Sequence, residues 1–346
     1  MSGKKVSFLA ALCLFLSAIE YAIPKPLPFM RLGLANLPVL LSLSILNTRE
    51  YILLVLFKII AQALVSGTLF SYIFIFSLAG SISSAIAMLV FYKIFSKTSF
   101  ASYLSYSLAG SLFNNISQIV CSYFIVFKDS TRYIAPLLLL SGLVTGSFLG
   151  IFTNLFIQKS RWYNFLQNTD NDAEDINILN NDITKKQSNN ALLWLFTGLI
   201  GFILLLALSS LWLKWCVVAL FIIILLIKRK GKVKILPSLL ITITITIFAM
   251  LEPSGKILYE KGFIKITQGA LTSGLTRSSV LVGMVFISQT AVSKEMHIPG
   301  KAGNFIGRVF AYLDYLTQNK LVFKDRNIIE VIDNHLMNAW GIKADV

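Results

Sequence analysis

Long apolar runs separated by short polar segments dominate the chain. In the first half, these runs predict six membrane-spanning helices. They cover residues 6–23, 32–46, 51–66, 78–95, 103–127 and 134–157. A further apolar stretch, residues 67–80, is too short to span a bilayer with its flanking glycines, and we expect it to be re-entrant or part of a bent helix. The pattern predicts an all-α, polytopic membrane domain over residues 1–157.

A polar segment divides this domain from a second set of apolar runs. Residues 158–190 are rich in Asn and charged residues and have no sustained apolar period, which predicts a solvated linker. Helices are then expected at residues 191–209, 211–227, 235–251 and 269–292, with a polar hairpin before the last of them. The run ITITITI within 235–251 alternates like a strand, but inside an apolar run it predicts a helix whose Thr hydroxyls bond back to the preceding turn. The second membrane domain is thus expected over residues 191–292, followed by an amphipathic cytoplasmic tail over 293–346.

Composition and charge support a membrane protein and exclude a nucleic-acid binder. Hydrophobic residues make up 56% of the 346 residues and charged residues only 14%, and the mean hydropathy is +0.74. The net charge of +15 comes mainly from bases at the ends of the apolar runs. Their distribution favours a cytoplasmic N-terminus and linker in an inner membrane.

The chain lacks the common motifs of a self-sufficient catalyst. It has no GxxxxGK[ST], GxSxG, HExxH or DDxxD, so we expect neither ATP hydrolysis nor prenyl synthesis by this chain alone, and no cofactor. The acidic run DNDAED at 170–175 superficially resembles a magnesium site, but it lies in the Asn-rich linker, where no helix fixes its spacing. No metal site is therefore predicted.

Polar side chains inside apolar runs are the candidate binding residues, because charges and amides in hydrocarbon persist mainly where they face a cavity or a partner. Lys58 stands in the middle of its run, and Gln62 is one turn later on the same face. Binding of an anionic group by Lys58 and a structural role, either snorkelling to an interface or pairing with Glu20, are equally good hypotheses.

Two further groups complete the candidate site. Asn115 and Gln118 share a face at i, i+3 spacing and could bind the polar edge of a ligand, although bonding between helices is a slightly better explanation. Lys25 and Arg31 lie in a proline-rich outer loop, where they would attract an anionic substrate or anchor lipid head groups.

Three segments carry a family resemblance. The sequences MRLGLANLPVLLSL, LLVLFKIIAQALVSGTLFS and SLAGSLFNNISQ resemble the Gx transporter family, also called heptaprenyl diphosphate synthase component I, over about residues 1–157. The resemblance implies a six-helix domain like the substrate-binding S components of energy-coupling factor (ECF) transporters. It also implies a basic residue at Lys58 and a motif His-Asn-x-x-Gln, in which Asn114 of this chain departs from the His.

A second resemblance concerns residues 252–288, which look like the early part of an ECF T component, the coupling subunit. The Ala-Arg-Gly and Ala-Arg-Ser signatures that T components present to their ATPases do not occur here. Together the two resemblances imply a membrane subunit that captures a small-molecule substrate from the outside and is energised by separate ABC-type ATPases. The alternative is a noncatalytic membrane partner of a polyprenyl diphosphate synthase catalytic subunit. In both hypotheses the lipid bilayer surrounds the protein.

Overall fold

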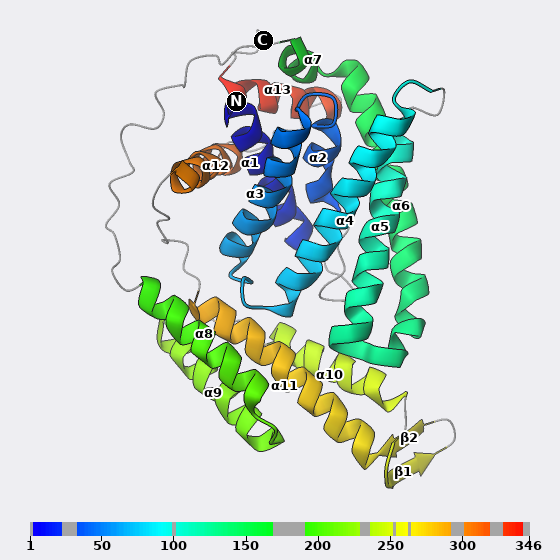
Figure 1. Cartoon of the computed structure of the whole chain (residues 1–346), viewed down its shortest axis with the longest axis vertical. Helices are drawn as coiled ribbons and strands as arrows, with labels where there is room; N and C mark the ends of the chain where they lie inside the picture. The colour runs from blue at the N-terminus through cyan, green and yellow to red at the C-terminus, as the bar shows by residue number, and fades with distance from the viewer. Residues whose placement is uncertain are drawn as a thin grey trace.

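The chain folds almost entirely into helices, as its apolar pattern predicts (Figure 1). The computed structural model describes residues 3–22, 33–98, 102–168, 191–228, 236–251, 254–261, 264–291, 301–318 and 328–341. Within these ranges, four helical segments are long and apolar enough to cross a membrane: Tyr72–Phe95, Tyr103–Lys159, Leu211–Lys228 and Gln268–Ala291. The all-α, polytopic membrane fold is therefore confirmed. The orientation of these helices relative to a bilayer stays a prediction.

The first part of the chain forms an N-terminal bundle, which we define as α1 to α7. Its long helices are α1 (Gly3–Ala22), α3 (Thr48–Ser66), α4 (Tyr72–Phe95), α5 (Tyr103–Cys121) and α6 (Thr131–Lys159), and the short α7 (Arg161–Asn168) follows. Helices α4, α5 and α6 pack side by side in chain order. A π-turn (η2, Ser122–Phe127) and a 3-10 turn (η3, Lys128–Ser130) reverse the chain between α5 and α6. The predicted linker therefore begins with helix, and its acidic run lies outside the described residues.

The predicted second span, residues 32–46, is wrong. In its place stand a 3-10 turn, η1 (Leu34–Asn36), and α2 (Leu37–Leu41), which at five residues is only roughly 8 Å long. Gly33 precedes them with φ of 86°, a left-handed conformation that favours glycine, and Pro38 occupies the start of α2. The hydroxyl of Ser42 then donates to the carbonyl of Val39 at 2.7 Å, in the turn that ends the helix. Apolar composition alone did not reveal these breaks.

Residues 67–80 were predicted to be re-entrant or part of a bent helix, and the structure shows most of them at the start of a helix. Gly67 ends α3 with φ of 63°, and a short turn leads to Ser71, whose hydroxyl accepts a hydrogen bond from the backbone N–H of Ile73 at 3.2 Å. This cap starts α4 at Tyr72, so most of the segment is the first part of a continuous helix.

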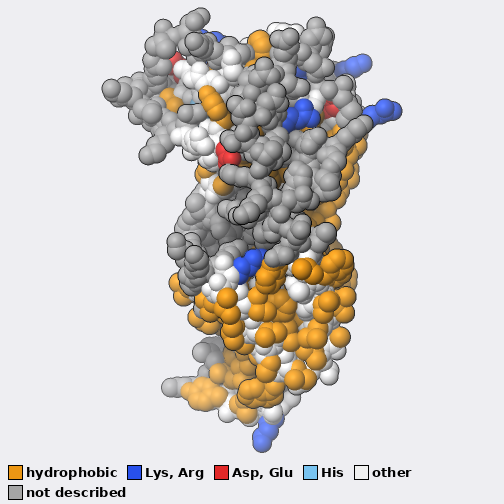
Figure 2. Space-filling model, turned by 90° about the vertical axis from the view of Figure 1, so that its left-hand side faces the viewer, with side chains coloured by type: hydrophobic (Ala, Val, Ile, Leu, Met, Phe, Trp, Pro, Cys, Tyr) orange, Lys and Arg blue, Asp and Glu red, His pale blue; other side chains and the backbone are white. Residues whose placement is uncertain are grey.

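The second part forms a C-terminal bundle, which we define as α8 (Ala191–Ala207), α9 (Leu211–Lys228), α10 (Leu236–Met250), α11 (Gln268–Ala291) and a β-hairpin. The strands β1 (Ile257–Lys261) and β2 (Ile264–Thr267) pair antiparallel, which confirms the predicted polar hairpin. Helix α11 lies against α8, α9 and α10 and is the most buried of the four. Apolar side chains cover the face over this bundle in Figure 2. Exposed apolar residues on α8 and α9 include Ile200, Trp212 and Ile227.

The ITITITI run is helical in α10, as predicted. The hydroxyl of Thr242 donates to the carbonyl of Ser238 at 3.0 Å, and that of Thr246 donates to the carbonyl of Thr242 at 2.7 Å. These bonds satisfy the hydroxyls within the helix itself, so the β-branched residues fit an apolar helix without partners elsewhere.

One apolar cluster joins the two bundles at the end where α5 turns into α6 (Figure 1). The rings of Phe127 and Phe248 lie 5.1 Å apart, and the hydroxyl of Ser130 donates to the carbonyl of Phe248 at 3.0 Å. Nearby, the backbone N–H of Phe70 donates to the hydroxyl of Ser288 at 3.0 Å. The bundles therefore share both apolar packing and hydrogen bonds.

The C-terminal tail returns to the N-terminal bundle. We call α12 (Lys301–Gln318) and α13 (Ile328–Trp340) the tail helices; α12 packs along α1, and α13 contacts α6 and α7. The ring of Phe8, in the middle of this packing, lies 5.3 Å from Tyr312 and 5.1 Å from Trp340. The tail was predicted as an amphipathic segment at the membrane surface. Its apolar face completes the core around α1, and its position relative to a membrane stays a prediction.

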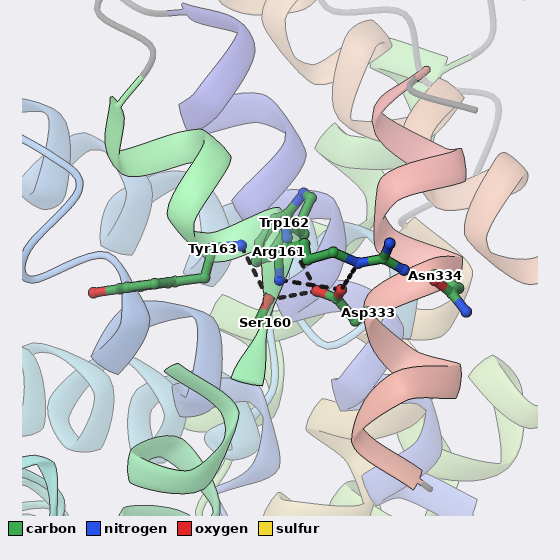
Figure 3. Close-up of polar contacts among 6 residues, drawn as sticks. All are labelled: Ser160, Arg161, Trp162, Tyr163, Asp333 and Asn334. Carbon is green, nitrogen blue, oxygen red and sulfur yellow. Dashed lines mark hydrogen bonds and ion pairs between the residues drawn. The ribbon is translucent and has the colours of Figure 1, made fainter. Parts of the chain in front are cut away.

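A buried carboxylate fixes the tail at the start of α7 (Figure 3). Asp333 is only 3% exposed, and it accepts hydrogen bonds from the hydroxyl of Ser160 at 2.5 Å and from the backbone N–H groups of Arg161 and Trp162, each at 3.1 Å. Ser160 in turn accepts from the backbone N–H of Tyr163 at 3.0 Å. Asp333 and Ser160 together cap the N-terminus of α7, where an anion also interacts favourably with the helix dipole.

Candidate functional site

A small cavity lies inside the N-terminal bundle, between η1–α2 and helices α4, α5 and α6. Its polar lining includes Asn36, Ser84, Asn114, Asn115 and Thr145, and its apolar lining includes Leu37, Leu40, Met88 and Leu149. The cavity measures about 20 Å³, which is enough for one or two ordered water molecules. Polar side chains thus converge inside helices that are otherwise apolar on the outside.

Lys58 lies directly behind one wall of this cavity. It is 3% exposed and comes from the middle of α3, as the sequence predicts. Its Nζ donates a hydrogen bond to Oδ1 of Asn36, and Asn36 lines the cavity. One side chain therefore separates the ammonium group from the cavity. The predicted alternative of pairing with Glu20, which is also buried on α1, stays a hypothesis.

The opposite wall consists of two neighbouring amides on α5. Nδ2 of Asn114 donates to Oδ1 of Asn115 at 3.3 Å, and Nδ2 of Asn115 donates to the carbonyl of Leu138 on α6 at 2.6 Å. A side chain at Gly142 would overlap Asn115, so this glycine allows α5 and α6 to approach closely enough for the bond. Asn115 therefore bonds between helices, as the structural hypothesis expected, and lines the cavity as well.

Gln62 and Gln118 do not line the cavity. Nε2 of Gln62 donates to the hydroxyl of Ser17 on α1, which ties α3 to α1 one turn beyond Lys58. Gln118 is 1% exposed and lies one turn beyond Asn114 on α5. Neither its Nε2 nor its Oε1 has a hydrogen-bond partner in the part of the chain that the structure describes. The structure thus brings only Lys58 and Asn115 of the predicted residues to the cavity, and Lys25 and Arg31 lie outside the described residues.

The exposed basic residues of the N-terminal bundle lie at the ends of its helices, in two groups at opposite ends of the bundle, as the sequence pattern suggests. The ends at α7 and α13 lie together at one end of the bundle, and the α5–α6 connection lies at the other (Figure 1). Exposed bases on the helix ends near α7 are Arg49, Lys93, Lys97, Lys159 and Arg161. Hydroxyls link these helix ends, because Tyr103 donates to Ser44 at 3.0 Å and lies 3.1 Å from the hydroxyl of Tyr163. We call this surface the basic end.

Sequence reasoning missed Asn36, Ser84 and Asn114 as cavity residues. Asn36 carried a usable signal, since it is an amide within an apolar run between Gly33 and Pro38. Ser84 had none, because serines are common in α4 and only the tertiary packing selects one of them. In chemical terms the site offers a cation, hydroxyls and amides, and no cluster of three or more His, Cys, Asp or Glu occurs among the described residues. Such a set can bind and orient a ligand.

The helices and the buried polar cavity define a multi-pass α-helical membrane protein with a candidate ligand site inside its N-terminal bundle. Residues 9–156, which contain this cavity, match the family heptaprenyl diphosphate synthase component I, and this confirms the family resemblance of the N-terminal part. Residues 190–293 match a family described as a domain of unknown function (DUF8519). No curated protein and no solved structure matches the chain. The resemblance of the C-terminal part to an ECF T component stays a hypothesis.

Proposed function

We propose that this chain is a noncatalytic membrane subunit of a polyprenyl diphosphate synthase in the inner membrane. The observation that carries the proposal is the match of residues 9–156 to heptaprenyl diphosphate synthase component I. The absence of a DDxxD motif from the sequence assigns the condensation to another chain, because the diphosphate substrates of such reactions are held through magnesium by clustered carboxylates. The role left for this subunit is to hold the catalytic chain and its lipid product at the membrane.

The basic end of the N-terminal bundle is the proposed docking surface for the catalytic chain. Its five exposed bases lie at or next to the ends of α3, α4, α6 and α7. The Ser44–Tyr103–Tyr163 hydroxyls and the bond from Ser160 to Asp333 join neighbouring elements at this end. Clustered positive charge is also typical of the cytoplasmic side of membrane proteins, where a soluble catalytic chain would approach. A partner with an acidic surface would be attracted there.

Purification of the tagged full chain from native membranes in mild detergent, followed by mass spectrometry, tests the proposal. We expect a DDxxD-containing prenyl synthase chain and a polyprenyl lipid to copurify. Replacing Lys93 and Lys97 by Gln should weaken retention of that chain. The matched pair Lys128→Gln and Arg132→Gln, at the other end of the bundle, should leave retention unchanged. Absence of any prenyl synthase from the purified complex would contradict the proposal.

Uptake of a small metabolite is the second candidate function, favoured by one observation. A buried lysine beside a polar cavity is typical of substrate pathways in membrane proteins. In this case ABC-type ATPases and a bound metabolite would copurify instead, and the N-terminal bundle would move against the C-terminal bundle to release the substrate.

A further inference from the structure

The cavity in the N-terminal bundle has the chemistry of an anion site. Lys58 supplies a positive charge one side chain away, and the amide groups of Asn114 and Asn115 lie on the opposite wall. The hydroxyl of Ser84, on a residue 1% exposed, has no hydrogen-bond partner in the described structure. Neither Asp nor Glu is among the described residues that line the cavity. Charge-assisted hydrogen bonds from such donors favour a phosphate or a carboxylate.

Apolar side chains beside these donors restrict the ligand class further. Leu37, Leu40 and Leu149 line the same cavity, so a polar head group bound there would lie next to an apolar surface. Pockets with this combination typically hold amphiphiles, whose head group is fixed by a few polar contacts and whose chain is buried by apolar ones. A small hydrophilic ion would leave these leucines without a role.

The segment η1–α2 is the shortest of the elements around the cavity. At about 20 Å³ the cavity is too small for a phosphate group, and three of its walls are long helices packed through Gly110, Gly142 and Gly146. The fourth wall is a 3-10 turn and a five-residue helix, preceded by Gly33 in a left-handed conformation. Asn36 of this wall accepts a hydrogen bond from Lys58. Displacement of Asn36 would enlarge the cavity and let an incoming anion take its place as this acceptor.

We infer that Lys58, Ser84, Asn114 and Asn115 bind the phosphate-bearing head group of an amphiphile, and that the anion replaces Asn36 as the acceptor of the Lys58 hydrogen bond. Only the choice of an isoprenoid diphosphate as the amphiphile rests on the proposed function. An anionic phospholipid offers the same phosphate chemistry, so the experiment compares both sources.

Binding of radiolabelled farnesyl diphosphate to the full chain in phosphatidylcholine nanodiscs tests this inference. We expect Lys58→Met to weaken binding by at least about tenfold, whereas Lys58→Arg, which keeps the charge, should stay within about threefold of the original chain. Ser84→Ala should weaken binding by about threefold without harming folding, because its hydroxyl has no described partner to lose. Lys214→Met is the matched control, since Lys214 is a lysine only 8% exposed in α9 of the other bundle.

Competitors separate the ligand sources. Competition by farnesyl diphosphate but not by farnesol or inorganic diphosphate supports the amphiphile with its head group, and competition by phosphatidylglycerol in the disc assigns the site to a membrane lipid. Binding unchanged in both Lys58→Met and Ser84→Ala, or no binding of either phosphate-bearing lipid, would overturn the inference. Copurification of the prenyl synthase without binding here contradicts only this site. Binding without the synthase contradicts only the proposed function.

Discussion

The two bundles differ in how completely their buried polar groups find partners in the described structure. In the C-terminal bundle, buried hydroxyls bond to carbonyls of their own helix, as Ser279 does with Thr276 at 2.7 Å and Thr290 with Phe286 at 2.8 Å. No buried side-chain nitrogen or oxygen lacks a partner in the described part of this bundle. The N-terminal bundle and the tail helices contain all such atoms found in the described structure, among them those of Ser77, Ser84 and Gln118.

This difference indicates where a ligand belongs. A hydroxyl that donates to a carbonyl of its own helix needs no hydrogen-bond partner elsewhere. The buried hydroxyls described in the C-terminal bundle therefore need no ligand to satisfy them. Buried polar atoms without partners reduce stability, and proteins retain them mainly at sites of function or where water or a ligand supplies the missing bond. The contrast therefore supports the proposal that the ligand site lies in the N-terminal bundle.

Replacing Asp333 should have the largest effect, because it tests whether the tail is part of the N-terminal region. Asp333→Ala removes three hydrogen bonds and the cap of α7, and we expect it to lower the free energy of unfolding by about 2–4 kcal/mol. Thermal unfolding in detergent, together with hydrogen exchange in α7 and α13, measures the loss. Asn334→Ala is the control, since Asn334 bonds only to the exposed Arg161 guanidinium at 2.9 Å in the described structure and should change stability by less than about 0.5 kcal/mol. Equal effects of the two variants would refute the role of Asp333.

Replacing Gln118 tests the difference between the two bundles in buried unpartnered polar atoms most directly. Gln118→Leu removes two buried polar atoms without described partners, so it should stabilise the protein by about 1–3 kcal/mol. Thr246→Val in α10 removes a hydroxyl that bonds within its own helix, and we expect a change below about 1 kcal/mol. Thermal unfolding of both variants checks the pair. Destabilisation by Gln118→Leu would reveal a bound water or ligand at this amide.

Lowering the pH should weaken tail docking to a smaller extent. Burial lowers the pKa of His335 below its ordinary value of 6.5, although a hydrogen bond with the backbone of Leu316 opposes this shift. Between its lowered pKa and about 6.5, the released tail binds a proton that the docked tail does not, so docking loses free energy as the pH falls through this window. Hydrogen-exchange protection of α13, corrected for intrinsic rates, should fall as the pH is lowered from about 7.5 to about 5.5, a range that extends about one unit on either side of the ordinary pKa. His335→Phe should abolish this part of the pH dependence.

Local patterns predicted most helices but not their tertiary partners. The apolar runs identified α1, α3, α5, α6 and α8 to α11, and the alternating Thr residues of α10 were assigned correctly because an apolar environment makes their hydroxyls bond within the helix. The span at 32–46 was wrong because hydropathy averages over Gly33 and Pro38, the two residues that break the helix. A run of adequate apolar content is thus necessary for a span but does not establish one.

The candidate site was only half predictable for the same reason. Lys58 and Asn115 are conspicuous as polar residues in apolar runs; Asn115 lines the cavity, and Lys58 bonds to Asn36 in its wall. Their partners Asn36 and Leu138 lie 22 and 23 residues away and are selected by helix packing. The contact between Ser160 and Asp333 joins residues 173 apart, a pairing that no periodicity within either segment encodes.

The returning tail also has a consequence for how the protein is made. Synthesis proceeds from the N-terminal side, so Phe8 is made more than 300 residues before Tyr312 and Trp340, against which its ring packs. At about 5–20 residues per second, roughly 20–70 s separate the synthesis of these partners. During that interval the face of α1 that carries Phe8 lacks this part of its core, which forms only when the tail helices pack onto it. Truncation before residue 301 would remove the tail helices, so α1 would lack these packing partners permanently.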